Sequence, residues 1–456
     1  MVWTTGLLIA ILVLSADLAA RQPVDEVSTH MLTAVGCLLL APGFAFLQSF
    51  VTVRRWRGRH LMEHRVEFLR RSLLGCNLVI WLFGCVSLLV IAKWPQLIRE
   101  NWGLGQIPLL DELALAIPML GSVLLSWIVI YDAENALKGE QETPQTKRSH
   151  LALSRLRTFG GLVLAPLAML FLSRDLLAMW YPEGLSPLGT CMSFIVFLVV
   201  LLGVYPLLLS MTWKTRRVED AALRSKLEKA AKEAGLANEQ FRVWDTDSTI
   251  TNALVVGVIP GLRRVFLSDQ LLERFDQDEV VAVYRHELGH VVYNHLHMRL
   301  AMVLVPLLAI SAVVVMSGEQ ATASDYANNG MRLTVWFACM LAFLLYASKV
   351  VTRFIRRSEV QADLFAISRP NGKICVRRAE VYCQALLKMG AISPELYEQS
   401  TAAHPSIVLR TQVIRQVVNQ PEQASKFHRR FRSEQQIAAA CLVALVVFAV
   451  LVGQII

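Results

Sequence analysis

Hydrophobic residues of this chain gather in long blocks that are separated by more polar segments. A helix of about 20 apolar residues crosses the roughly 30 Å hydrocarbon core of a bilayer. Nine blocks approach that length, and they cover residues 3–20, 31–52, 73–92, 113–131, 159–180, 191–211, 300–316, 333–350 and 437–456. The pattern therefore predicts a mainly α, polytopic helical membrane protein with about nine spans.

Two of these blocks allow an alternative. Residues 3–20 also resemble the apolar region of a signal peptide, because Ala16 and Ala20 are small residues of the kind found at cleavage sites. Against this, no Lys or Arg precedes the block. The block at 300–316 is short for a span, and a buried or hairpin-forming segment is its alternative.

Basic residues are concentrated in every second loop between the blocks. The first such loop is the richest, with Arg54, Arg55, Arg57, Arg59, Arg65, Arg70 and Arg71, and the others are 132–158, 214–299 and 351–436. The loops between them carry few positive charges. Because Lys and Arg favour the cytoplasmic side, we expect the N-terminus and both long segments in the cytoplasm and the chain in the cell (inner) membrane.

The composition agrees with a membrane protein. Hydrophobic residues make up 55% of the chain and charged residues only 18%, which is more apolar than a soluble domain needs. The net charge of +9 could indicate nucleic-acid binding, but its distribution over alternate loops favours a topology signal and contact with anionic headgroups. We therefore expect the lipid bilayer as a partner and no nucleic acid. The cysteines show no disulfide framework.

The predicted spans divide the chain into five parts. Six N-terminal spans with basic cytoplasmic loops (1–212) are followed by a first cytoplasmic segment (213–299), two spans (300–350), a second cytoplasmic segment (351–436) and a C-terminal span (437–456). The two cytoplasmic segments could form one small α+β domain. Its first part predicts a helix from Val218 to about Gly235 and then strands at 241–244, 253–258 and 264–267, with a hairpin between the last two.

A second helix is expected to begin at Asp276, which with Glu279 forms a capping arrangement. This helix carries His286 and His290, one helical turn apart, so that both imidazoles can reach one metal ion. Glu287 lies near enough to polarise a water on that metal. Zinc suits such a site, because it accepts imidazole and carboxylate ligands and keeps an open position in catalytic sites. The alternative is two surface histidines on a capped helix.

Three protein ligands are typical of catalytic zinc, so a third is required. Glu359 is the best candidate, and Asp363, one turn further on, could accept a hydrogen bond from a ligating histidine. Alternatively, both carboxylates only balance the neighbouring arginines. His295 and His297 lie beyond the metal face by spacing, and we interpret them as structural.

These motifs resemble the family of membrane zinc peptidases that includes the type I CAAX prenyl protease and the bacterial heat-shock protease HtpX. The resemblance rests on residues 286–290, on 359–363, on 252–257 with 264–272, and on 404–406 with Arg410. It covers about residues 216–415. The six N-terminal spans carry no motif of this family, and the C-terminal span departs from the prenyl protease pattern.

The resemblance implies a zincin-like fold for the cytoplasmic domain. It implies His286, His290 and Glu359 as ligands of one Zn²⁺ per chain and Glu287 as the catalytic base. It further suggests that Asn252 binds substrate backbone, and that His404 or Arg410 contacts the substrate or the developing oxyanion. A turn residue at Asn252 and a carboxylate neighbour at Arg410 remain alternatives.

The expected function is a zinc metalloendopeptidase that hydrolyses peptide bonds of membrane-associated proteins. The metal helix runs almost directly into residues 300–316, which places the site near the membrane surface. A CAAX-type protease that processes lipidated proteins is the first alternative. A non-enzymatic membrane protein with a structural metal site is weaker, because mid-span ionisable residues are few and a structural site has no use for Glu287.

Overall fold

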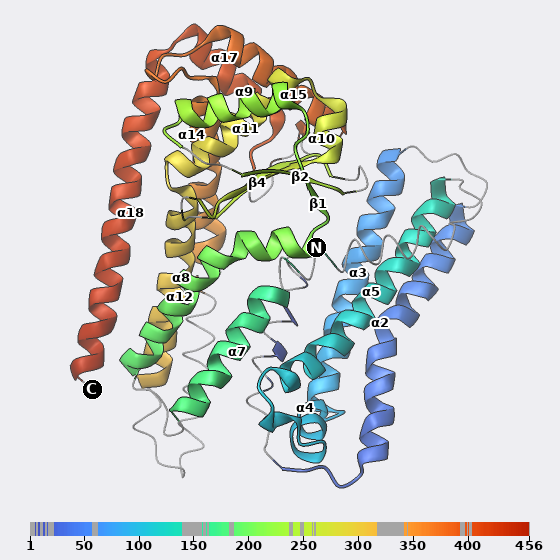
Figure 1. The fold of residues 1–456 in the computed structure, drawn as a ribbon. Helices are drawn as coiled ribbons and strands as arrows, with labels where there is room; N and C mark the ends of the chain where they lie inside the picture. The colour runs from blue at the N-terminus through green and yellow to red at the C-terminus, as the bar shows by residue number, and fades with distance from the viewer. Residues whose placement is uncertain are drawn as a thin grey trace. The chain divides into compact units, whose positions relative to one another are not determined.

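The structure is a computed structural model that describes residues 22–56, 63–138, 164–181, 187–236, 240–246, 250–257, 261–316, 345–392 and 404–455, with isolated positions between them. The chain forms two compact units, Met1–Leu185 with Leu208–Trp213 and Ser186–Leu207 with Lys214–Ile456. The predicted mainly helical fold with a small sheet is confirmed (Figure 1). The five-part division by spans stays a prediction.

Long apolar helices make up the first unit. They are α2 (Val27–Trp56), α3 (Glu63–Val90), α5 (Leu110–Lys138) and α7 (Ala165–Trp180), with the short helical turns α4 (Trp94–Gln96), η2 (Leu97–Asn101) and η3 (Leu104–Gln106) between α3 and α5. α2, α3 and α5 pack side by side (Figure 1). At Gly84 of α3 an added Cβ would lie 2.7 Å from the carbonyl oxygen of Cys37, so a small residue permits this close approach.

Two buried polar side chains of α3 find hydrogen-bond partners on the neighbouring helices. The Asn77 amide donates to the carbonyl of Ala41 at 2.8 Å, and the Trp81 indole donates to that of Met119 at 3.0 Å. Within the hydrocarbon core of a bilayer no water can hydrogen-bond to such groups, so the protein must supply their partners. The pattern is that of helices packed within a bilayer.

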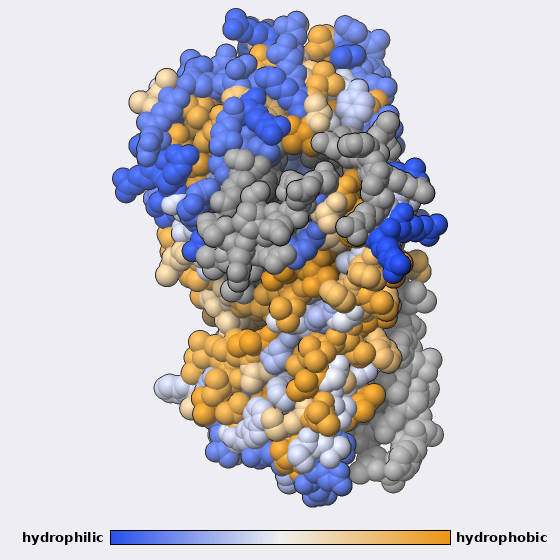
Figure 2. Space-filling view, turned by 90° about the vertical axis from the view of Figure 1, so that its right-hand side faces the viewer, coloured by the Kyte–Doolittle hydropathy of each residue, from blue (hydrophilic) through white to orange (hydrophobic). Residues whose placement is uncertain are grey.

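Three helices among the described residues are long and apolar enough to cross a membrane, Val27–Trp56, Phe68–Val90 and Leu110–Leu137. They coincide with the second, third and fourth predicted spans. Large apolar side chains such as Leu32, Phe46 and Phe83 are exposed on them, and apolar residues cover much of the surface in Figure 2. The chain is therefore an integral membrane protein. Most of the predicted spans 3–20 and 333–350 lies outside the described residues, and the number nine stays a prediction.

A four-stranded sheet forms the base of the second unit, in the order β1-β2-β4-β3. Its strands are β1 (Thr215–Arg217), β2 (Gln240–Trp244), β3 (Ala253–Val256) and β4 (Arg264–Ser268). β2 and β4 are parallel, and β1 and β3 are antiparallel edge strands. The predicted β3–β4 hairpin is present, with Gly261 at a φ of +84° in its connection. β1 was not predicted.

Ten helices accompany this sheet among the described residues of the second unit. The unit contains α8 (Pro187–Thr212, shared with the first unit), α9 (Ala221–Glu233), α10 (Asp269–Arg274), α11 (Gln277–Val292), α12 (His295–Met316), η5 (Ala347–Val351), α14 (Thr352–Ile367), α15 (Val376–Ile392), α17 (Ile407–Asn419) and α18 (Glu422–Ile455). α9 and α11 share a hydrophobic core with the sheet. Asp220 caps α9, so this helix begins later than predicted. α12 and α18 lie side by side (Figure 1).

Candidate metal centre

Two neighbouring helices, α11 and α14, carry the candidate metal ligands. α11 begins with the predicted capping box, in which Asp276 and Glu279 satisfy each other's backbone N–H groups. α14 crosses α11 closely at Gly289, where an added Cβ would lie 2.9 Å from Cα of Ala362. The glycine between the two histidines therefore lets the second helix come near enough to present Glu359.

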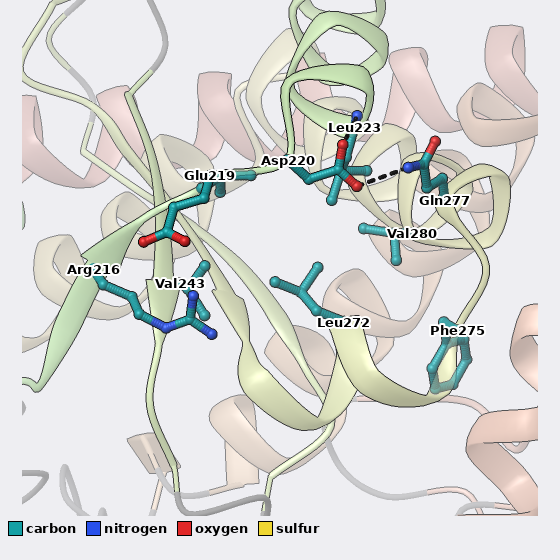
Figure 3. A pocket seen from close by; sticks show the side chains of 10 residues that line it. Arg216, Glu219, Asp220, Leu223, Val243, Leu272, Phe275, Gln277 and Val280 are labelled. Carbon is teal, nitrogen blue, oxygen red and sulfur yellow. Dashed lines mark hydrogen bonds between the residues drawn. The ribbon is translucent and has the colours of Figure 1, made fainter.

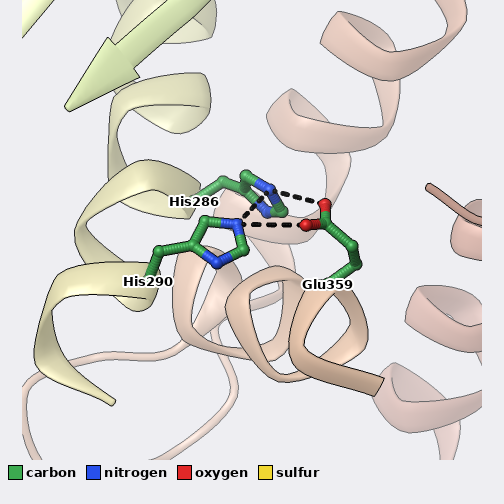
Figure 4. Close-up of side chains that lie close together, drawn as sticks. All are labelled: His286, His290 and Glu359. Atoms are coloured by element: carbon green, nitrogen blue, oxygen red, sulfur yellow. Dashed lines mark hydrogen bonds and ion pairs between the residues drawn. The ribbon is translucent and has the colours of Figure 1, made fainter. Parts of the chain in front are cut away.

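His286, His290 and Glu359 bring their side chains to one point (Figure 4). Nε2 of His286 lies 3.2 Å from Nε2 of His290, and each of these nitrogens lies 3.4 Å from an oxygen of Glu359. In a tetrahedral zinc site with bonds of about 2.0–2.1 Å, neighbouring donors are about 3.3 Å apart. The donor set and its spacing fit zinc, and these three residues could hold the ion.

A second layer of side chains contacts His286 at Nδ1, the ring nitrogen that does not face Glu359. Nδ1 of His286 lies 2.9 Å from a carboxylate oxygen of Asp363, as the helical spacing predicted. The Tyr382 hydroxyl donates to the same carboxylate at 2.7 Å. A carboxylate on Nδ1 fixes the tautomer in which Nε2 carries a lone pair for the metal.

Arg410 of α17 completes this layer. Its guanidinium donates to both oxygens of Asp363, at 2.9 and 2.6 Å, and the side chain is only 10% exposed. Such a bidentate pair is strong and directional. A substrate contact for Arg410 stays a prediction. The geometry favours a role in positioning Asp363, which resembles the alternative that Arg410 only neighbours a carboxylate.

Glu359 has two further partners around its buried carboxylate. Nδ1 of His404 lies 2.8 Å from Oε2, and Nη2 of Arg299 donates to Oε1 at 3.0 Å. The His404 side chain is 51% exposed, so it stands at the open side of the cluster. Arg299 is not among the predicted site residues; its only signal in the sequence is an isolated arginine immediately before the predicted span at 300–316.

Glu287 faces the same cluster from α11. Burial, reinforced by the nearby Glu359 carboxylate, raises the pKa of Glu287 to about 7, although the positive charge of His286 opposes this. Within the part of the chain that is described, no group hydrogen-bonds its carboxyl. A carboxyl with these properties can exchange a proton with a water near neutral pH.

Asn252 directly precedes the edge strand β3 and is exposed. Its backbone N–H donates to Oγ of Ser268 at 2.9 Å, and its carbonyl accepts from the Ser268 N–H at 3.0 Å. These bonds tie its backbone to β4, and no strand of the described residues pairs with the other edge of β3. A role in substrate binding stays a prediction.

Zinc binding to this site is expected to strengthen as pH rises toward about 9. Burial alone would lower the pKa of His286, but its hydrogen bonds to Asp363 and Glu359 outweigh that effect and raise the pKa to about 9. Below this pH the imidazole is protonated, and it must lose one proton to bind a metal. The zinc association constant should therefore rise about tenfold per pH unit below pH 9 and level off above it.

Competition with a chelator of known proton affinity, in a pH series on the full chain in detergent, measures this slope. Asp363→Asn is the matched variant: without the carboxylate the His286 pKa falls and the slope should weaken at neutral pH. A wild-type affinity that does not change over this range would contradict the expectation.

A second group of acidic residues lies in the first unit. Asp111, Glu112 and Asp175 offer oxygens within 4.8 Å of one another. Arg99 donates to Asp111 at 2.6 Å, and Arg174 pairs with both Glu112 and Asp175. Each of the three carboxylates thus pairs with an arginine, and the group is an ion-pair network.

The second unit contains a cavity of about 160 Å³, whose lining side chains are drawn in Figure 3. Its wall includes Val243 of β2 and Leu272 of α10, and its rim carries Asp220, which accepts a hydrogen bond from Gln277 at 2.8 Å. None of the residues lining it belongs to the metal cluster.

Comparison with known proteins agrees with the predicted resemblance. Residues 217–418 match the sequence model of Peptidase family M48. A CAAX prenyl protease 1 homolog of Arabidopsis thaliana is 35% identical over 101 residues, which cover 21% of this chain and 24% of that protein. A Protease HtpX homolog of Herminiimonas arsenicoxydans is 26% identical over 189 residues, which cover 39% of this chain and 60% of that protein. The matches thus span less than two thirds of either relative.

The fold also has a counterpart among solved structures. The crystal structure of S. mikatae Ste24p superposes with a TM-score of 0.52 at 16% sequence identity, and the match covers 83% of this chain and 99% of that chain. At this identity the likeness concerns the fold alone. It extends well beyond residues 217–418 and so includes helices in which the sequence carries no family motif.

Proposed function

Because residues 217–418 carry the sequence of peptidase family M48, we propose that the chain is a zinc-dependent endopeptidase of the membrane that acts on membrane-associated proteins. The best support is the group of three metal-donor side chains near Glu287. Their donor atoms, Nε2 of His286, Nε2 of His290 and the oxygens of Glu359, lie 3.2–3.4 Å from one another. His286, His290 and Glu359 would hold one Zn²⁺, which supplies a Lewis acid that polarises a carbonyl and lowers the pKa of water.

The protein's own groups would move the protons. Glu287 would take a proton from the attacking water and later give it to the leaving amine, a task suited to a buried carboxyl next to His286 and Glu359. His404, at the open side of the cluster, would contact the substrate near the oxygen on which negative charge develops. Asn252 would bind substrate backbone at the edge of β3.

The position of the site in the chain supports substrates that are held at the membrane. α11 ends at Val292 and α12 begins at His295, and α12 contains the predicted span 300–316. The metal helix and an apolar helix are therefore only a few residues apart. We propose a cytoplasmic site in the cell (inner) membrane, on the basis of the loop charges.

A second candidate is the processing of lipidated protein tails. It is favoured by the name of one relative, the CAAX prenyl protease 1 homolog. The HtpX homolog favours the broader cleavage of membrane proteins. A structural metal site without catalysis is the weakest candidate, since it leaves Glu287 without a use.

Purified full-length chain in detergent tests this proposal. We expect about one zinc per chain and cleavage of either an unfolded membrane protein or a prenylated peptide. A zinc chelator should abolish the cleavage, and added Zn²⁺ should restore it. The substrate that is cleaved decides between the two candidates, and cleavage that survives full removal of zinc would refute the proposal.

A further inference from the structure

A chain of hydrogen bonds leads away from the ligand His290 on the side opposite the metal. Nδ1 of His290 lies 2.9 Å from Nδ1 of His295, and Nε2 of His295 lies 2.8 Å from Oε1 of Gln361. Nε2 of Gln361 in turn lies 3.3 Å from Nδ1 of His428. The chain thus joins α11, α12, α14 and α18, and no catalytic step proposed above uses it.

The backbone at the end of α11 makes this arrangement possible. An uninterrupted helix would turn His295 about 140° away from His290, since each residue adds about 100°. Instead the polypeptide backbone turns out of the helix at Asn294, which has a φ of +55°. Asparagine is one of the few residues other than glycine that tolerate this conformation. The turn brings His295 back to His290, where its side chain is fully buried.

The amide of Gln361 determines which atoms donate and which accept along this chain of hydrogen bonds. Its oxygen accepts, so Nε2 of His295 carries the proton and Nδ1 of His295 is an acceptor. Nδ1 of His290 must then be the donor, which leaves a lone pair on Nε2, the nitrogen that faces Glu359. The NH₂ group of Gln361 donates to His428 and fixes the orientation of the amide.

We propose that His295, Gln361 and His428 form a positioning chain that holds His290 in its metal-binding tautomer. The inference rests on the proposed function in that zinc is the metal. The two histidines then differ in the partner of their Nδ1 atom. Nδ1 of His286 faces the anionic carboxylate of Asp363, whereas Nδ1 of His290 faces the neutral imidazole of His295. The positioning chain also links α18, whose later part is the predicted ninth span, to the metal centre through His428.

Zinc affinity of the full-length chain in detergent, measured by competition with a chelator, tests the positioning chain. His295→Phe keeps a ring of similar shape next to Tyr293 and Phe431 but has no acceptor, and it should weaken zinc binding about 10- to 100-fold. His295→Asn offers an acceptor near the place of Nδ1 and should restore most of this loss. Gln361→Leu should weaken binding and Gln361→Glu, which keeps the acceptor, should not.

His297→Phe is the matched control, because His297 is exposed on the same helix. The Co²⁺-substituted protein gives a second readout: its visible absorption should change in His295→Phe and stay as in the wild type in His297→Phe. Zinc affinity of His295→Phe within twofold of the wild type, or His295→Asn as weak as His295→Phe, would overturn the inference. A wild type that binds no zinc would instead refute the proposed function.

Discussion

Replacement of Glu287 by glutamine is expected to lower kcat/KM for peptide cleavage about 10²- to 10⁴-fold while zinc stays bound. Glutamine has nearly the same shape as glutamate but cannot accept the proton of a water. Glu287 is no member of the ligand cluster, so its loss leaves His286, His290 and Glu359 in place. The measurements are cleavage rates of a defined substrate and zinc content of the same preparation.

Cleavage rate and zinc content together distinguish a lost catalytic base from a lost metal site. Glu380 lies exposed on α15, and Glu380→Gln therefore controls for the loss of a carboxylate as such. We expect it to match the wild type in both rate and zinc content. A Glu287→Gln protein with full activity would remove Glu287 from the mechanism, and one that had lost its zinc would indicate a structural role for this residue.

Local signals explain why the sequence predicted α11 well. The capping box lies within four residues, and the two histidines lie within a single helical turn. The β3–β4 hairpin likewise depends on a short connection that contains Gly261. Each of these features is decided by neighbours in the sequence. The three-residue strand β1 has no such signal, because it forms only by pairing with β2.

The environment of the ligands depends on distant parts of the chain, and the sequence predicted it less well. Arg410 lies 47 residues from Asp363, and its charge alone did not distinguish a substrate contact from a buried ion pair. Helical spacing continued past Val292 would turn His295 away from His290. The left-handed conformation of Asn294 breaks that spacing, and no periodic pattern reveals it.

Replacement of Glu359 by alanine is expected to cost the chain its zinc. The carboxylate is 1% exposed and is the only anionic member of the ligand group. Its removal leaves two imidazoles and takes away the partner of Arg299 and His404. Loss of an outer-shell partner typically weakens metal binding about 10- to 100-fold. Loss of a direct ligand should exceed that, so the purified variant should hold little metal and show no cleavage.

Zinc content of purified variants, measured together with a thermal unfolding curve, separates loss of a ligand from loss of the fold. Glu359→Asp keeps the charge but shortens the side chain by one methylene, so it should still pair with a cation yet bind zinc weakly. Glu380→Ala, on the exposed face of α15, should keep wild-type zinc. If Glu359→Ala retained its zinc, the third ligand would have to be another residue, and His404, 2.8 Å from the same carboxylate, would be the first to replace.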